Sequence, residues 1–319
     1  MASETICASA GRRDSYGVDM LRRPLAVLLV AVLVLAGCSG GDDDGTAAFR
    51  SGTVTVTDAG DDPTTTLAWG WEGASPASVL LVTAVTQSVA VDGGAPTEAP
   101  LPTAVTLLEI TPMTGEGRTE LVVTVTDVGA STEDLDVEDP ELAAALADQA
   151  AAMRRLVGAS ASLGVSATGA VTDFSPATAP DVELPVATLL ERTITELARL
   201  VVEFPDEAVG PGARWETTST RVSQGIAWDV TTSWRLDSVD GDLHTVSFTL
   251  SETAPRQGVP AAEGRDIEGM IEGEGSVVVD LASAAIVSGE LVTSLEASIF
   301  DGDEVVATTS NRIGTIASS

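Results

Sequence analysis

Short segments rich in valine and threonine recur along most of this 319-residue chain, and they limit its fold more than any other feature. Apolar and polar residues alternate within each segment, and glycine, proline or aspartate marks its ends, which is typical of strands in an antiparallel sheet. Asp240-Gly241-Asp242 and Asp301-Gly302-Asp303 supply residues that accept positive φ in turns. The expected strands are Thr53–Thr57, Val79–Val91, Val105–Ile110, Leu121–Val128, Trp215–Val222, Ile226–Leu236, Thr245–Leu250, Val277–Asp280 and Gly289–Ile299.

Two segments change to a helical period. Pro140–Val157 is rich in alanine, and Gly158 directly after it suits a helix end. Pro185–Phe204 places Leu190 and Ile194 on one apolar stripe. We expect both helices to pack into a core, with a ligand groove as the alternative.

The order of these segments is similar in the two parts of the chain, residues 53–180 and 181–319. Each part also carries a hairpin of small residues, Leu163–Asp173 and Ser283–Thr293, which gives Gly169 and Gly289 equivalent places. An ancient duplication explains this similarity, although strands of threonine and valine also resemble one another by chance. The predicted fold class is α+β and strand-dominated: two related antiparallel β halves, with a half-barrel as one form, and two helices between them.

Leu35-Ala36-Gly37-Cys38 forms a lipobox, the recognition sequence for cleavage of a lipoprotein signal peptide. It ends the apolar run Leu25–Leu35, which follows the basic residues Arg22 and Arg23, as expected of a secretory signal. The run is too short for a bilayer core of about 30 Å, which needs roughly 20 residues. We therefore expect a diacylglyceryl group on Cys38 and a lipid-anchored protein on the outer face of the cell membrane.

The same signal divides the first 52 residues. We expect residues 1–19 to be an extension wrongly included before the true start at Met20, and residues 20–37 to be the signal peptide. Residues 38–52 would then hold the lipidated cysteine and a flexible acidic tether. Asp42-Asp43-Asp44 in this tether lacks the alternating ligand spacing of a calcium loop. In a host with two membranes, Ser39 would instead favour transfer to the outer membrane.

Composition excludes several classes of function. The formal net charge is −32, and such a chain repels phosphate backbones, so we expect no nucleic-acid partner. The two cysteines are Cys7, which would be removed with the signal, and Cys38, so no disulfide is expected in the fold. The hydrophobic core alone must then stabilise the protein.

Residues suited to catalysis or metal binding are few, and we expect no enzyme and no cofactor. His244 is the single histidine, and we expect it on the surface beside a turn. An acidic cluster before the first helix suits a solvated loop, with weak divalent-cation binding as the alternative; it comprises Glu133, Asp134, Asp136, Glu138 and Asp139. We expect the five tryptophans to anchor the core, with an apolar cavity lining as the alternative. They are Trp69, Trp71, Trp215, Trp228 and Trp234.

Four stretches carry a resemblance to an uncharacterised family of secreted lipoproteins from high-GC Gram-positive bacteria. They are Val79–Gly93, Glu203–Glu216, Trp234–Leu250 and Gly275–Leu295. The resemblance brings no catalytic residues with it. A lipobox followed by strands and few helices is also similar to the LolA/LprG-type lipid carriers, which implies a half-open β-barrel with helices against its concave face.

Two functional hypotheses remain open at this point. In the first, the anchored protein binds a lipid or another apolar ligand, which requires a cavity above about 300 Å³. In the second, it is an acidic scaffold that presents its surface to an envelope protein or to the cell wall. An unrecognised hydrolase is the third hypothesis, and it requires a pocket that joins His244 to two carboxylates.

Overall fold

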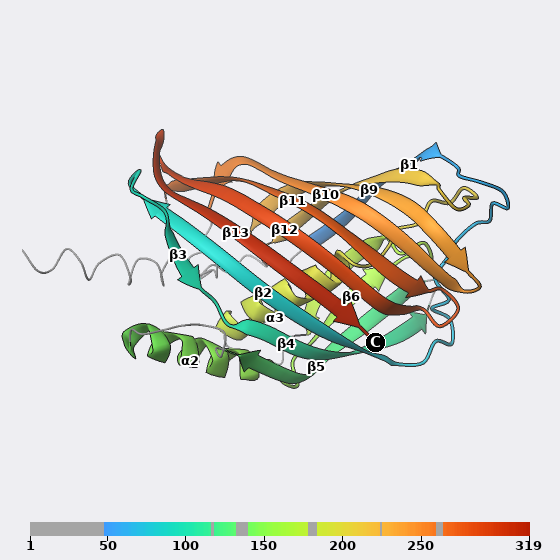
Figure 1. Cartoon of the computed structure of the whole chain (residues 1–319), viewed down its shortest axis with the longest axis horizontal. Helices are drawn as coiled ribbons and strands as arrows, with labels where there is room; N and C mark the ends of the chain where they lie inside the picture. Colours follow the sequence, from blue (N-terminus) through green and yellow to red (C-terminus); the bar gives the residue numbers. More distant parts are fainter. Residues whose placement is uncertain (1–47, 116–117, 132–139, 178–183, 224, 260–263) are drawn as a thin grey trace, which may run out of the picture.

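One antiparallel sheet forms almost the whole of the fold. The computed structural model describes residues 48–115, 118–131, 140–177, 184–223, 225–259 and 264–319. The sheet contains 13 strands, of which 12 follow one another in the order β1-β8-β9-β10-β11-β12-β13-β2-β4-β5-β6-β7, while β3 pairs with β2 (Figure 1). The strands are β1 (Ala48–Asp58), β2 (Ala77–Val91), β3 (Thr97–Pro100), β4 (Thr103–Gly115), β5 (Arg118–Ser131), β6 (Ser160–Val165), β7 (Val171–Ala177), β8 (Arg214–Ser223), β9 (Ile226–Asp240), β10 (Leu243–Gly258), β11 (Arg265–Asp280), β12 (Ala285–Asp301) and β13 (Glu304–Ser318).

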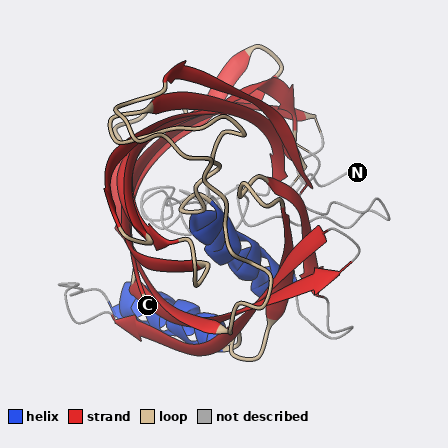
Figure 2. Ribbon diagram, turned by 90° about the vertical axis from the view of Figure 1, so that its right-hand side faces the viewer, coloured by secondary structure: helices blue, strands red, loops and turns tan. Residues whose placement is uncertain are grey.

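The sheet curls into a nearly closed barrel, seen along its axis in Figure 2. Its two edge strands, β1 and β7, lie next to each other, and the rings of Phe49 and Phe174 meet edge-on across them at 6.3 Å. No ladder of hydrogen bonds between β1 and β7 is present in the described residues. We call this boundary the seam.

The predicted fold class is wrong in its central feature. The chain does not form two β halves with helices between them, because β1 pairs with β8 and β2 pairs with β13. These pairings join strands from both parts of the chain into one barrel wall. The equivalence of Gly169 and Gly289 fails as well: Gly169 has φ of +95° in a turn, whereas Gly289 lies within β12 and faces Leu200.

Both predicted helices are present, as α2 (Pro140–Arg154) and α3 (Leu184–Ala198). α3 lies inside the ring of strands in Figure 2, and Leu190, Ile194 and Leu197 are buried in the main core. α2 packs against β5 and α3. Neither of these two helices, the only ones in the described residues, is long and apolar enough to cross a bilayer.

The strands alternate between a polar outer face and an apolar inner face. On β10, for example, Val246, Phe248 and Leu250 point into the core, while Thr249 between them is exposed. Inward side chains of the other strands and of α3 complete the core. This alternation is the reverse of the apolar-outside, polar-inside pattern of transmembrane barrels.

The two ends of the barrel differ. At one end, loops cross the interior (Figure 2), and the indoles of Trp69 and Trp71 are stacked there at 4.8 Å. These indoles donate to the carbonyls of Val202 and Ser166 at 3.0 Å. At the other end, which we call the Ala48 end, β1 begins at Ala48, and α3 and β9 begin there too.

Candidate functional site

α3 is amphipathic inside the barrel, and this places polar groups in the lumen. One face, with Ile194 and Leu197, belongs to the main core. The other face carries Arg192 and Glu196, followed by Arg199 just after the helix end, at a spacing that keeps all three on one side. A helix within a barrel usually has apolar neighbours all round, so this polar stripe indicates a site.

A buried ion network holds the polar stripe to the barrel wall. The network consists of Glu196, Arg199, Glu252 on β10 and Arg221 on β8. The Arg199 guanidinium donates to Glu252 Oε1 at 2.8 and 2.9 Å, and Arg221 donates to Glu252 Oε2. Glu196 also accepts a bond from the Thr315 hydroxyl at 3.3 Å.

The network shifts the pKa of its members in opposite directions. Burial alone would raise the pKa of Glu252, but Arg199 and Arg221 lower it below its ordinary value. Burial would lower the pKa of Arg199, yet Glu196 and Glu252 raise it above its ordinary value. Glu252 and Arg199 are therefore both charged near neutral pH.

A cavity of about 160 Å³, which we call the lumenal cavity, adjoins the network. Its apolar wall includes Ile226, Trp228, Ile267, Ile271 and Leu295. Three arginines and one glutamate also line it: Arg192, Arg199, Arg221 and Glu196. The lining therefore carries excess positive charge, within a chain whose net charge is −32.

Three donors in this lining have no protein partner in the described residues: the guanidinium of Arg192, the amide nitrogen of Asn311, and the buried Nε of Arg221. Arg192 is accessible to solvent although the barrel wall surrounds it, and it makes no hydrogen bond or ion pair. Its enclosure lowers the pKa of Arg192, and Glu196 offsets this in part. Arginine nevertheless stays protonated in proteins because its ordinary pKa is so high. The Asn311 carboxamide accepts from Thr309 at 3.5 Å through Oδ1, and its amide nitrogen donates to no protein group.

The strand register orders the lining along the barrel axis. Asn311, Leu295, Ile271 and Glu252 lie on one cross-strand row. Ile226 and Ser223 lie nearer the rim, at the β8–β9 turn, where Val222 pairs with Ala48. The lumenal cavity therefore lies toward the Ala48 end.

A second cavity of about 90 Å³ reaches the seam, where Phe49 and Val171 contribute to its lining. Glu203 also lines it, and burial raises the pKa of this residue to about 7. A third internal space of about 20 Å³ lies beside Trp69 and Trp71. None of these three cavities reaches 300 Å³.

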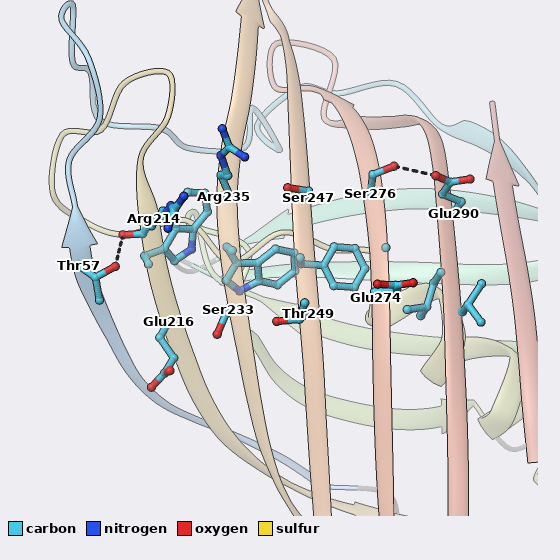
Figure 3. Close-up of a pocket in the computed structure, with 16 residues that line it drawn as sticks. Thr57, Arg214, Glu216, Ser233, Arg235, Ser247, Thr249, Glu274, Ser276 and Glu290 are labelled. Atoms are coloured by element: carbon cyan, nitrogen blue, oxygen red, sulfur yellow. Dashed lines mark hydrogen bonds between the residues drawn. The ribbon is translucent and has the colours of Figure 1, made fainter. Parts of the chain in front are cut away.

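The largest of the four hollows described here lies outside the barrel. We call it the outer hollow; its volume is about 640 Å³, and it is open and shallow (Figure 3). Two cross-strand rows line it, and Figure 3 shows their side chains on the outer face of β8 to β12. One row runs Arg214, Arg235, Ser247, Ser276 and Glu290, and the other runs Glu216, Ser233, Thr249, Glu274 and Val292.

The tryptophans behave as predicted, with one addition. All five are buried, at 1–7% exposed. Trp69, Trp215 and Trp234 form a series of ring contacts with Phe204 and Phe248 through the core. Trp228 belongs to a smaller apolar cluster, lines the lumenal cavity, and carries the Arg221 guanidinium 5.6 Å from its ring centroid.

The prediction for His244 is wrong. The residue is 5% exposed, and its Nδ1 lies 3.0 Å from the carbonyl of Asp242 in the β9–β10 turn. It is buried because its position on β10 faces inward, on the same side as Val246. None of the four hollows described above includes it.

Other sequence-based predictions fall outside the described residues. They are the lipobox residues Leu35, Ala36 and Gly37, the lipidation site Cys38, and the acidic cluster at positions 133–139. Within the described part of the chain, no three His, Cys, Asp or Glu side chains are grouped to hold a metal ion.

The residues of the lumenal site were missed at the sequence level, although two signals point to them. Arg192, Glu196 and Arg199 recur at helical spacing opposite the apolar stripe of their helix. Glu252 follows Val246, Phe248 and Leu250 at steps of two, so a charge occupies an inward strand position. A charge at a predicted core position indicates a buried partner.

Comparison with known proteins adds little to this description. No protein-family model matches the chain, and no curated protein matches it. Two solved structures of OmpT, an outer membrane protein of Vibrio cholerae, are similar at a TM-score of 0.18: a loop L8 deletion mutant at 7% identity and an in-vitro folded trimer form at 8%. Each match covers 76% of this chain and 99% of the other. A likeness this low carries no conclusion about fold or function.

Proposed function

We propose that this chain is a lipid-anchored, extracytoplasmic binding protein whose lumenal cavity holds a small ligand with an apolar part. The observation that carries the proposal is the lumenal cavity itself, where apolar walls and unpaired donors meet inside a barrel. Binding sites of this composition are typical of proteins that fix a small molecule by a few polar groups within an apolar enclosure.

The position of the tether supports the proposal. The lumenal cavity lies toward the end where β1 begins. Cys38 precedes Ala48 by a segment that spans at most roughly 35 Å when fully extended. A lipid on Cys38 would therefore hold the rim of the cavity near the bilayer surface, where apolar ligands partition.

The cavity size restricts the ligand. A volume of about 160 Å³ is below the 300 Å³ that the lipid-carrier hypothesis required. An engineered apolar cavity of about 150 Å³ accommodates benzene. The ligand that fits the described barrel is therefore of this size, and a lipid with long acyl chains does not fit beside α3.

Native mass spectrometry of the exported protein tests the binding proposal. We expect a small molecule that extracts into organic solvent to accompany the wild-type protein. Ala297→Leu should remove it, because Ala297 faces the lumenal cavity. Ser298→Leu on the outward neighbouring position is the matched control, and circular dichroism checks that both variants fold. A ligand-free mass in the wild type, or equal occupancy in the two variants, would overturn the proposal.

The anchor is tested separately by Cys38→Ser. We expect the wild type to occur in the membrane fraction as a mature lipoprotein. The variant should not occur there in that form, because the thiol is the site of lipid attachment. Metabolic labelling with an alkyne fatty acid provides the readout. A labelled variant, or an unlabelled wild type, would contradict the assignment of Cys38.

The outer hollow favours a second candidate function, an acidic scaffold that binds an envelope protein. Its rows combine Arg214 and Arg235 with Glu274 and Glu290 on an exposed face, as in polar contact surfaces. A photo-crosslinking residue at Thr249 should then capture a discrete partner in the intact envelope. The same residue at Thr308, on the exposed face of β13, is the control. Equal capture at both positions would exclude a specific surface.

A further inference from the structure

We infer that the ligand of the lumenal cavity is a short-chain anionic amphiphile, such as a carboxylate, recognised by Arg192 and Asn311. This inference rests on the proposed binding function and specifies its ligand class. It follows from the charges, the donors and the volume of the lumenal cavity.

The charge of the lining selects an anion. Three arginines and one glutamate line the lumenal cavity, and the second carboxylate of the network, Glu252, is only 1% exposed and already accepts from two arginines. Arg192 is the arginine of this group that has no hydrogen bond or ion pair in the described residues. A cationic ligand would meet a like charge, whereas a carboxylate would gain a charge-assisted bond.

A second donor supports the same ligand class. Asn311 is 9% exposed, so its amide lies almost entirely within the barrel wall. Its Nδ2 donates to no protein group in the described residues, so this donor is available to a ligand in the lumenal cavity. A carboxylate can accept from Arg192 and Asn311 together, since it offers two oxygens.

The remaining lining suits a short hydrocarbon chain. Ile226, Trp228, Ile267 and Ile271 form a continuous apolar cluster with Ala297, and this cluster borders the cavity. Each buried methylene contributes about 0.8 kcal/mol, which is about fourfold in affinity. Affinity should rise by this factor with each added carbon and level off once a chain of roughly benzene-like volume fills the space.

Isothermal titration calorimetry on the exported full-length product, reconstituted into phosphatidylcholine vesicles, tests the inference. The probes are butanoate, hexanoate and octanoate, with hexylamine and hexanol as matched compounds of other charge. We expect hexanoate to bind more tightly than hexanol and hexylamine not to bind. We also expect a rise in affinity from butanoate to hexanoate of about 15-fold, and a smaller rise to octanoate.

Matched arginine variants connect the binding to this site. Arg192→Gln should weaken hexanoate binding at least about tenfold and leave hexanol binding unchanged. Arg312→Gln removes one positive charge from the outer face of β13, next to Asn311, and should have no effect. If hexanol binds and hexanoate does not, the anionic class is wrong while the binding proposal survives. If none of the probes binds, both are wrong.

Discussion

Glu252 is the residue on which the buried ion network depends. It accepts from Arg199 and Arg221, and no other carboxylate in the described residues pairs with Arg221. We expect Glu252→Gln to lower the free energy of unfolding by about 3 kcal/mol at pH 7, because the buried Arg221 loses its counter-charge and Arg199 keeps only Glu196. Urea denaturation measures the effect.

The outward Glu272 on β11 supplies the control for this substitution. Glu272→Gln should change stability by less than about 0.5 kcal/mol. Because the pKa of Glu252 is lowered in the fold, its contribution is present above the ordinary carboxyl pKa and is lost as pH falls through the folded value. Equal effects of the two substitutions at pH 7 would show that the network does not stabilise the fold.

Glu203 should show the opposite dependence on pH. Its pKa is raised from 4.5 to about 7, so the folded state favours the protonated form. Stability from this group is fully present below pH 4.5 and is lost as pH rises through 7, by up to about 3 kcal/mol. Glu203→Gln should therefore stabilise the protein at pH 8 and have little effect at pH 4.5. A constant difference between these pH values would contradict the burial of the carboxyl group.

Sequence patterns locate the aromatic core but not the lumenal site. Tryptophans in an aromatic-poor chain identify core anchors directly, and all five are buried. Arg192 and Glu252 were not identified, because the lumenal cavity requires α3 to lie within β8 to β13. The sequence around Arg192 or Glu252 contains no signal that predicts which strands surround α3.

Among the elements, β11 depends on inward glycines. A Cβ on Gly275 would lie 2.7 Å from Phe248 Cζ and would also meet the carbonyl of Glu290. Gly275 thus leaves room for the ring of Phe248 within the core. We expect Gly275→Ala to lower the free energy of unfolding by about 1–3 kcal/mol, since the wall must move.

The matched substitution on another strand is Gly314→Ala. Gly314 lies in β13, and a Cβ there would meet nothing within 4 Å. Its replacement should change stability by less than about 0.5 kcal/mol. A Gly275→Ala protein as stable as Gly314→Ala would mean that β11 and Phe248 adjust freely.

Most elements were predictable because their signals are local. The nine expected strands all lie within observed ones, and the apolar stripe of α3 is buried as expected. β13 was missed because its inward positions include the polar residues Thr309, Asn311 and Thr315, which leaves no clear apolar face in the sequence. The expected hairpin Ser283–Thr293 is in fact a turn followed by the start of β12, since Ala284 adopts φ of +54°.

At the scale of the whole molecule, the seam should be the first part of the barrel to open. Among the strands that the structure describes, β1 pairs only with β8, and β7 pairs only with β6. We expect the seam-facing amides of these strands to exchange with deuterium orders of magnitude faster than those of β11 and β12. Hydrogen–deuterium exchange with mass spectrometry gives this readout, and uniform protection around the barrel would show instead that the seam is bonded.

The arrangement of the sheet could not be read from the sequence. The local sequence pattern predicts individual strands, but the pairs β1–β8 and β2–β13 join segments that are far apart in the chain. Valine and threonine strands pair with many partners equally well, so register and order are decided by closure around α3.

This interleaving governs when the barrel can close during synthesis of the chain. The gap between β2 and β12 is filled by β13, which pairs with both, so the barrel stays incomplete until the segment Glu304–Ser318 has been made. Until then β2 presents an unpaired apolar edge, the kind of surface that aggregates and that folding helpers shield. A chain with this strand order therefore needs such shielding until β13 has joined the sheet.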